Sequence, residues 1–406
     1  MKYEKIARYL SAVLLLLFTL VLSSCDNSDD ETQPEPQIEN LEDGTRLTEI
    51  SIANLSGLIG LFGIPELSDL ADQLNYDIVG YEVTYTTTYL GEEITASGLV
   101  TFPETTDPVP MLSFQNGTIA SNDEAPTNNQ SEFFTFSAIA STGYIFVIPD
   151  YIGFGASSEY ISPYHHAEYT GRAVIDLMKA AKELAVQEGY NFNGKAFLAG
   201  YSEGGYAAMA SHKLMEEEQP EGFELIASAP ASGGYDVKGF QEYLFGLETY
   251  DNPYFLAFVA LSYKTTYGYD DPLSDLFQEP YATIIPDLFD GSNSGSRING
   301  QLTTVIADLI QPDILANIED PRYSDFVNAL NDNSLVNWQP QAPMFMYHGT
   351  ADVTVPYQNS VDTYDKLIAN GANPESIQLI DLVGEDHNSG VAPYALAMLS
   401  VFNELK

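Results

Sequence analysis

Cysteine and basic residues are both scarce in this chain of 406 residues. Cys25 is the only cysteine, so no disulfide can form within the chain. Lysine and arginine total 15 against 58 aspartate and glutamate residues, which gives a formal net charge of −43. A chain this acidic repels the phosphates of a nucleic acid, so we expect no nucleic-acid partner. The loop at 290–295 lacks the full ligand pattern of a calcium loop, and we expect neither a metal nor a cofactor.

Internal repeats are also absent at any fixed period, which argues against a solenoid or a propeller. Hydrophobic residues make up 45% of the chain, enough to bury a full core in a protein of this length. We therefore expect a globular protein of one large domain or two smaller ones.

The first 24 residues have the features of a signal peptide. Three basic residues precede an apolar stretch at 11–22, which is too short to span a membrane comfortably. The stretch ends in Leu22-Ser23-Ser24-Cys25, which resembles the lipobox of bacterial lipoproteins. That resemblance implies cleavage before Cys25, lipidation of its thiol and a membrane anchor in the cell envelope.

Residues 25–48 form an acidic stretch that is too polar to order itself, so we predict a flexible tether there. The acidic residues just after Cys25 resemble the surface-export signal of lipoproteins in the Bacteroidetes group, which implies the outer membrane and its exposed face. A solvated spacer is the alternative explanation. Residues 49–406 would then form the folded domain.

Apolar runs alternate with helical patterns along most of this domain. Residues 78–90 and 93–102 flank Gly91 and predict an antiparallel hairpin. Further strands are predicted at 109–114, 144–148, 195–201, 225–229, 344–347 and 377–383, and helices at 131–140, 170–187, 202–217, 361–370 and 393–405. This alternation predicts an α/β fold, with a mostly parallel sheet covered by helices on both faces.

One segment, at about 236–338, interrupts the alternation. It shows no strong strand pattern and is rich in tyrosine and phenylalanine, so we predict a mostly helical insertion. At this place in the fold a helical cap would cover the active site and exclude water. An extension of the ordinary core is the alternative.

A nucleophile motif lies near the middle of the chain. Gly200-Tyr201-Ser202-Glu203-Gly204 matches G-x-S-x-G and falls between a predicted strand and a predicted helix. A sharp strand-to-helix turn holds such a serine in a strained conformation. The residues two positions before and two positions after it must be glycine to avoid clashes. We therefore predict Ser202 as the nucleophile.

A serine hydroxyl needs a base, and the sequence offers five histidines. In this fold the order is serine, acid, histidine, which removes His165 and His166 because they precede the motif. His212 is expected on the surface of the following helix, and His348 precedes the expected acid. His387 remains as the predicted base, in a polar loop after the last strand.

Asp352 is the predicted acid, because it lies in the turn after the strand at 344–347; Asp381 and Asp386 are minor alternatives. An attack by Ser202 on a carbonyl group would produce an oxyanion. We expect this oxyanion to be bound by the backbone N–H of Glu203 and by one N–H from the loop after the strand at 109–114. Gly117 would let that loop approach the substrate, which makes Thr118 N–H the expected second donor; a plain Asn-Gly turn is the alternative.

From about Tyr81 to the C-terminus the chain resembles the secreted lipase family within the alpha/beta hydrolases. The resemblance rests on the motifs above and on two further segments, 115–118 (Gln-Asn-Gly-Thr) and 149–155 (Pro-Asp-Tyr-Ile-Gly-Phe-Gly), and on the helix at 171–176. It implies an alpha/beta-hydrolase fold and cofactor-free hydrolysis of carboxylic esters, often of lipids, by a lipase or carboxylesterase. Asn116 departs from the family, where histidine is common, which affects the expected oxyanion geometry.

Two other functions remain open at this stage. A serine peptidase of the prolyl-oligopeptidase type shares the fold and the order of the three residues, but such enzymes usually carry a propeller, and no blade repeats precede residue 80. A non-catalytic lipoprotein that binds a ligand under the cap is the other candidate, and the intact set of three residues argues against it.

Overall fold

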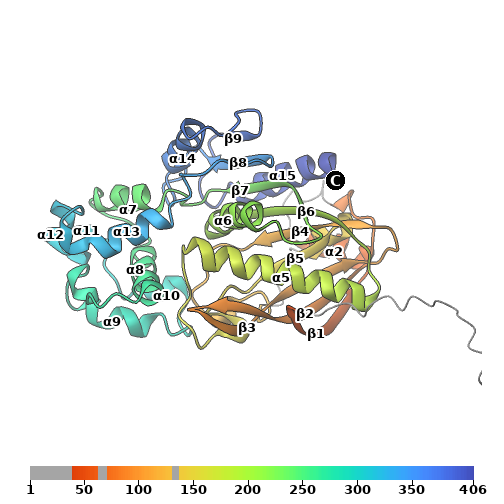
Figure 1. The fold of residues 1–406 in the computed structure, drawn as a ribbon, viewed down its shortest axis with the longest axis horizontal. Coiled ribbons are helices and arrows are strands. Elements are labelled where there is room, and N and C mark those ends of the chain that lie inside the picture. The colour runs from red at the N-terminus through yellow and green to blue at the C-terminus, as the bar shows by residue number, and fades with distance from the viewer. Residues whose placement is uncertain (1–38, 63–70, 130–136) are drawn as a thin grey trace, which may run out of the picture. The chain divides into compact units, whose positions relative to one another are not determined.

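The computed structural model describes residues 39–62, 71–129 and 137–406 (Figure 1). The predicted signal peptide, Cys25 and most of the predicted tether lie outside these residues, as does most of the helix predicted at 131–140. The alpha/beta-hydrolase fold predicted from the sequence is confirmed in the described part.

A nine-stranded sheet forms the centre of the fold, in the order β1-β2-β3-β5-β4-β6-β7-β8-β9. The first four strands in this order pair antiparallel, and the strands from β5 to β9 pair parallel. The strands are β1 (Leu41–Ile50), β2 (Ile78–Tyr89), β3 (Glu92–Pro103), β4 (Val109–Gln115), β5 (Ile145–Pro149), β6 (Phe192–Tyr201), β7 (Glu224–Ala231), β8 (Met344–Gly349) and β9 (Ile377–Leu382).

The predicted hairpin forms as β2 and β3. Tyr89 pairs with Glu92, so Leu90 and Gly91 make a two-residue turn, with φ of 52° and 81°. Positive φ at both central positions is the geometry that matches the twist of a tight hairpin, and glycine adopts it without strain.

Side chains of the parallel strands alternate between two cores. In β6, Ala196 and Leu198 pack with α5 (Ala167–Glu188), whereas Phe197 and Ala199 pack with α15 (Val391–Leu405). The helix α6 (Glu203–Glu218) lies beside α5 over the same part of the sheet (Figure 1). Burial on both faces explains the continuous apolar runs from which the strands were predicted.

The predicted tether at 25–48 needs a correction, because β1 begins at Leu41. This strand lies at the edge of the sheet and pairs antiparallel with β2. The carboxylate of Glu183 in α5 accepts hydrogen bonds from the backbone of Asn40 and Leu41, at 3.2 and 2.7 Å. Most side chains of β1 are exposed or half-buried. The strand is thus ordered mainly by backbone hydrogen bonds. Because such bonds do not require apolar side chains, its sequence lacks the alternation of apolar and polar residues by which a strand is predicted.

The insertion between β7 and β8 is helical, as predicted. It gathers beyond one end of the sheet (Figure 1) and contains α7 (Val237–Phe245), α8 (Tyr254–Tyr267), α9 (Tyr281–Leu288), α10 (Gly295–Asn299), α11 (Ile306–Leu309), α12 (Pro312–Ala316) and α13 (Ser324–Asp332). Its buried apolar side chains are continuous with the core around α6 and β8, including Tyr206 and Met344. The insertion therefore shares the core of the hydrolase domain.

Two predicted helices differ from the structure. The helix predicted at 361–370 begins at Tyr357, as α14 (Tyr357–Ala369), and the described remainder of the helix predicted at 131–140 is a 3-10 turn at Ala138–Thr142. In the described part of the chain, no helix is both long and apolar enough to cross a membrane.

Candidate active site

The elbow around Ser202 joins β6 to α6. Ser202 has φ 61° and ψ −122°, a conformation that a residue other than glycine adopts only at a cost of about 1–3 kcal/mol. Its N–H donates to Ala231 O at 2.9 Å, and its own carbonyl accepts from Gly205 N at 2.9 Å. The neighbouring strand and the first turn of α6 thus hold the strained residue in place.

Glycine is required on both sides of the serine because the backbone passes very close to itself. A Cβ on Gly200 would overlap the carbonyl of Gly204, and a Cβ on Gly204 would overlap the carbonyl of Gln115 at the end of β4. These contacts explain the G-x-S-x-G spacing in physical terms, and they bring the loop after β4 against the elbow.

The structure brings the three predicted triad residues together. His387 Nε2 lies 2.9 Å from Ser202 Oγ, and His387 Nδ1 lies 2.6 Å from Asp352 Oδ2. An ionised carboxylate only accepts hydrogen bonds, so Nδ1 carries the proton and Nε2 is left to accept from the serine hydroxyl. The His387 side chain is 14% exposed, whereas that of Asp352 is fully buried. The hydrogen-bonded row of three side chains is therefore accessible from its serine end.

Asp352 is held as a carboxylate by donors on all sides. Its Oδ1 accepts from the backbone N–H of Thr354 and Val355, at 2.9 and 3.0 Å. Burial alone would raise the pKa of Asp352, but hydrogen bonds from His348 and His387 outweigh it and hold the pKa below its ordinary value. A buried anion beside His387 would stabilise the imidazolium if that ring took up a proton.

His348 is a contact of the acid that the sequence did not reveal. Its Nε2 donates to Val355 O at 2.9 Å and lies 3.3 Å from Asp352 Oδ2, while Ser360 Oγ lies 2.6 Å from Nδ1. The ring is fully buried. His348 therefore fixes the turn that carries Asp352, from the end of β8.

The two alternative acids are engaged elsewhere. Asp386 accepts hydrogen bonds from the backbone of Asn388 and Ser389 within its own loop, at 2.9 and 2.8 Å. Asp381 accepts from the hydroxyl of Tyr357 at 2.6 Å. Of the three candidate carboxylates, Asp352 is the one that contacts His387.

The loops that carry the acid and the base are joined by backbone hydrogen bonds. Ala351 N donates to Glu385 O at 3.0 Å, and Thr350 N donates to Leu382 O at 3.1 Å. A Cβ on Gly349 would overlap Glu385 O, so glycine is needed where the two loops cross. This crossing sets the distance between residues that are 35 positions apart in the sequence.

The loop after β4 lies beside the nucleophile, as predicted for an oxyanion loop. A Cβ built on Gly117 would lie 3.8 Å from Ser202 Cβ, which is an ordinary van der Waals distance. Thr118 N–H donates to no acceptor among the described residues, and Glu203 N–H is in the first turn of α6, where helix amides lack intrahelical acceptors. Both predicted donors are thus available beside Ser202, and their role stays a prediction.

Tyr151, in the Pro-Asp-Tyr segment after β5, supports that loop. Its hydroxyl donates to Asn116 O at 2.9 Å, and its backbone has φ 67°. A positive φ in a bulky residue is strained, and the buried ring of Tyr151 here contacts the loop after β4 through its hydroxyl. This contact gives a physical role to Tyr151 in the segment at 149–155.

The prediction that His212 lies on the surface of α6 is wrong. The ring is fully buried, with Nδ1 2.7 Å from Ser228 Oγ and Nε2 2.8 Å from Glu216 Oε1. The helix α6 packs against β7, and His212 lies on the face of α6 that is turned toward this strand. Its polar ring is therefore buried with hydrogen-bond partners. His165 and His166 are also buried, and burial lowers the pKa of each, in His166 to about 4.

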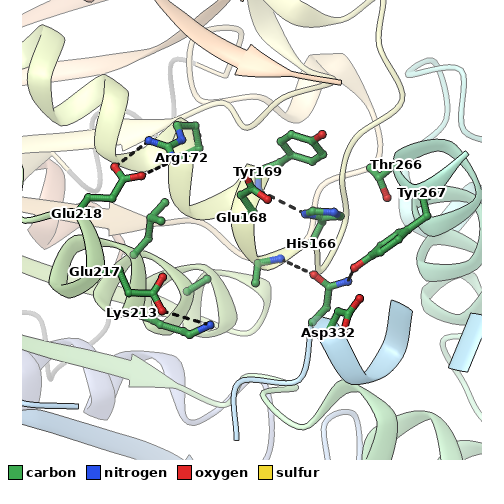
Figure 2. A pocket seen from close by; sticks show the side chains of 14 residues that line it. His166, Glu168, Tyr169, Arg172, Lys213, Glu217, Glu218, Thr266, Tyr267 and Asp332 are labelled. Atoms are coloured by element: carbon green, nitrogen blue, oxygen red, sulfur yellow. Dashed lines mark hydrogen bonds and ion pairs between the residues drawn. The ribbon is translucent and has the colours of Figure 1, made fainter. Parts of the chain in front are cut away.

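A polar cavity of about 660 Å³ lies away from the triad, between α5, α6, α8 and the end of α13 (Figure 2). Its two basic side chains are both paired, Arg172 with Glu218 and Lys213 with Glu217. None of Ser202, Asp352 and His387 lines it. Over residues 39–62, 71–129 and 137–406, no three metal-ligating side chains gather in a site.

Comparison with known proteins finds similarity to lipases, esterases and a hydrolase. The secretory lipase family matches residues 121–240, a segment that includes the elbow. Lipase 6 of Candida albicans is 26% identical over 295 residues, which are 64% of this chain. The match spans 58% of the length of that lipase.

Solved structures resemble almost the whole chain. A hydrolase-like protein of Legionella pneumophila superposes with a TM-score of 0.82 at 26% identity, covering 90% of this chain and 98% of that one. The rice cell wall degrading esterase LipA of Xanthomonas oryzae gives a TM-score of 0.77, also at 26% identity, over 90% and 97% of the two chains.

The parallel sheet, its strand-to-helix elbow and these relatives define the chain as an alpha/beta hydrolase. Within that class the chain is similar to proteins that are named as lipases and esterases.

Proposed function

We propose that the chain is a serine hydrolase of carboxylic esters that acts through an acyl-enzyme on Ser202. The observation that carries this proposal is the continuous chain of hydrogen bonds from Ser202 Oγ through His387 to the buried carboxylate of Asp352, at 2.9 and 2.6 Å. A strained nucleophile, an aligned base and an orienting acid are the parts that acyl transfer needs.

In the first half of the reaction, Ser202 Oγ attacks the ester carbonyl carbon while its proton passes to His387 Nε2. Asp352 keeps Nδ1 protonated and stabilises the resulting imidazolium. The tetrahedral intermediate collapses, His387 returns the proton to the leaving alkoxide, and the alcohol departs. Water then attacks the acyl-enzyme with His387 as base, which releases the carboxylic acid and restores Ser202.

Negative charge on the tetrahedral intermediate would be stabilised by the N–H groups of Glu203 and Thr118. The positive end of the α6 dipole points at the same place, because Glu203 opens the helix. One such donor is typically worth about 3–4 kcal/mol in an acyl-transfer enzyme.

The substrate is proposed to be a small-molecule or lipid ester with an apolar part. A cavity of about 350 Å³ lies between the segment after β5 and the insertion, and Phe154, Phe258 and Phe289 are among its lining residues. Ala120, two positions after Thr118, also lines it, whereas none of Ser202, Asp352 and His387 does, so a substrate would have to extend from Ser202 to reach it. An apolar acyl or alcohol group would bury surface there, and each buried methylene contributes about 0.8 kcal/mol.

We further propose that the chain is anchored in the cell envelope through a lipid on Cys25, in the outer membrane. This rests on the sequence Leu22-Ser23-Ser24-Cys25 and on the acidic stretch that follows it. Incorporation of labelled palmitate into the wild-type chain but not into Cys25→Ser would test the anchor.

The first test of the activity is hydrolysis of p-nitrophenyl esters of increasing acyl length by the full chain, beside Ser202→Ala. Activity that rises with chain length and disappears in the variant is expected for a lipase-like enzyme. Activity confined to the acetate ester would indicate small esters instead. Hydrolysis of peptides but of no ester would favour the peptidase alternative, and no hydrolysis at all would favour a binding lipoprotein.

A further inference from the structure

The side chain of Asn116 is a buried polar group that the proposed mechanism does not use. The residue lies in the loop after β4 and is 5% exposed. It is packed against the elbow, since a Cβ on Gly204 would lie 2.8 Å from Asn116 O. The side-chain oxygen Oδ1 is buried and has no hydrogen-bond partner among the described residues. A buried amide oxygen without a partner is costly, so the presence of asparagine here needs an explanation.

The other end of the Asn116 amide acts on the peptide group that carries the Thr118 N–H. Asn116 Nδ2 donates to Gly117 O at 3.1 Å. Turned round, the amide would place its oxygen against this carbonyl, and two acceptors cannot bond to each other. A peptide group is planar and trans, so its C=O and N–H point in opposite directions. A hydrogen bond that fixes Gly117 O therefore also fixes the direction of the Thr118 N–H.

The preceding peptide group is restrained from another segment of the chain. Tyr151 donates from its hydroxyl to Asn116 O at 2.9 Å. This carbonyl and the Gly117 N–H form one plane, and the Gly117 carbonyl and the Thr118 N–H form the next. Glycine between two planes allows more rotation than any other residue. Both planes therefore need a restraint if the Thr118 N–H is to keep one direction.

Tyr151 itself stands on a network around the neighbouring carboxyl group of Asp150. This fully buried group accepts from Thr127 N at 2.9 Å, from Thr127 Oγ1 at 2.6 Å and from Ser97 Oγ at 2.5 Å. A Cβ on Gly155 would overlap both the carboxyl group and Ser97 Oγ. These contacts hold the turn after β5, in which Tyr151 keeps its positive φ. The tyrosine hydroxyl is thus a fixed point for the loop that it contacts.

We propose that Asn116 is a positioning residue that aims the Thr118 N–H at the oxyanion, while Tyr151 holds the neighbouring peptide group. The inference rests on the proposed ester hydrolysis at Ser202. The substrate carbonyl oxygen gains its charge only as the transition state is approached, so a misdirected N–H weakens binding of the transition state more than binding of the substrate. Loss of the Asn116 amide should therefore lower kcat and leave KM almost unchanged.

The variant Asn116→Leu separates this role from a contribution to stability. Leucine is close to asparagine in size, and it removes the Nδ2 donor together with the unpartnered Oδ1. Removing a buried polar group that lacks a partner relieves a cost, which offsets the loss of the hydrogen bond to Gly117 O. We therefore expect a thermal unfolding temperature close to that of wild type, together with a loss of activity.

The test compares the full-length wild type and Asn116→Leu in hydrolysis of one p-nitrophenyl ester and in inhibition by an alkyl trifluoromethyl ketone. In the ketone adduct Ser202 Oγ bonds to the carbonyl carbon, the hydroxyl proton passes to His387 Nε2, and the carbonyl oxygen becomes an oxyanion. For Asn116→Leu we expect kcat to fall by about tenfold to hundredfold, less than for loss of a whole donor, with KM within about twofold of wild type. The inhibition constant of the ketone should rise by the same factor as kcat falls.

Tyr151→Phe tests the second restraint and keeps the inference testable if Asn116→Leu does not fold. It removes the hydroxyl that donates to Asn116 O, and we expect kcat to fall and the inhibition constant to rise by about threefold to tenfold. Tyr263→Phe is the matched control, because the buried Tyr263 also donates to a backbone carbonyl, that of His165, at 2.9 Å. The control should keep the wild-type kcat and inhibition constant.

Three results would overturn the inference. One is a wild-type kcat in Asn116→Leu, or in Tyr151→Phe where the first variant does not fold. Another is a fall in kcat without a matching loss of affinity for the ketone, and the third is an equal loss of activity in Tyr263→Phe. The inference and the proposed function fail differently. A Ser202→Ala variant with full activity defeats both, whereas an inactive Ser202→Ala beside a fully active Asn116→Leu defeats this inference alone.

Discussion

Two regions of the molecule that share no residue can be compared, because each contains a serine, a histidine and a carboxylate in the same order of contacts. In one, Ser202, His387 and Asp352 are joined at 2.9 and 2.6 Å. In the other, Ser228, His212 and Glu216 are joined at 2.7 and 2.8 Å. In both, the carboxylate fixes one ring nitrogen as a donor, so the other accepts from the serine hydroxyl. Hydrogen-bond geometry alone therefore does not distinguish an active site from a structural contact.

The backbone and the exposure of the serine make the difference. Ser202 stands on a strained turn at the end of a strand, next to amides without acceptors, whereas Ser228 lies within β7 and is fully buried. Glu216 also accepts from the backbone of Gln341 and Ala342, at 2.8 and 2.7 Å, which ties α6 to the segment entering β8. Ser228, His212 and Glu216 thus connect α6 to β7 and to the segment entering β8, and we call these three residues the clamp.

Replacing the two serines should separate the sets most sharply. Ser202→Ala removes the nucleophile and should lower kcat by at least about 10⁴-fold, since no other group can form the acyl-enzyme. Ser228→Ala should leave kcat/KM within about twofold. Initial rates on one p-nitrophenyl ester, for variants with matched thermal unfolding, decide the matter. Comparable losses in both variants would contradict the assignment.

The two carboxylates give the next largest contrast. Asp352→Asn should lower kcat by roughly 10³–10⁴-fold, because an amide can present its N–H to His387 and select the wrong tautomer. Its fold should persist, since the amide oxygen can still accept from Thr354 and Val355. Glu216→Gln provides the matched control for activity, and a kcat close to wild type is expected. Equal kcat in wild type and Asp352→Asn would refute the role of the acid.

Local patterns explain how much of the fold and the site the sequence could predict. The strands β4 to β9 have apolar runs because both faces are covered, and the elbow has a fixed spacing of glycines because a Cβ there would overlap the neighbouring backbone. Ser202 and His387 followed from that motif and from the order of residues along the chain. The short distance between His387 and Asp352 depends on the crossing of their two loops, which no local pattern in the sequence shows.

Features that depend on distant partners were missed. The edge strand β1 is held by backbone bonds to β2 and by Glu183 of α5, and its own side chains are mostly polar. His212 was placed on the surface because its partner Ser228 lies on a strand 16 residues further on.

The clamp should matter for stability in a pH-dependent way. Burial raises the pKa of Glu216, but hydrogen bonds from His212 and from two backbone amides hold it below its ordinary value. A depressed folded-state pKa contributes stability that is present above about pH 4.5 and is lost as the pH falls through the folded-state pKa. Glu216→Gln should therefore lower the free energy of unfolding by about 1–3 kcal/mol at pH 7, with a gap that closes in acid.

Urea unfolding of wild type and Glu216→Gln at pH 7 and at several values below 4.5 measures that gap. Glu217→Gln, the next residue on the same helix and exposed, should match wild type at every pH. A gap that stayed constant down to the lowest pH would show that the carboxylate charge does not act in the clamp.

The smallest expected effect concerns a contact between the insertion and the turn that carries Asp352. Tyr250 donates from its hydroxyl to Thr354 O at 2.8 Å, and Thr354 N donates to Asp352 Oδ1. Tyr250→Phe removes one hydrogen bond, worth about 1 kcal/mol, so kcat/KM should fall roughly threefold to fivefold as the acid turn loosens. Tyr243→Phe, an exposed tyrosine on α7, should change nothing. If both variants matched wild type in kcat/KM, the insertion would cover the site without bracing its acid, and the strained elbow and the buried carboxylate would suffice to align the three residues.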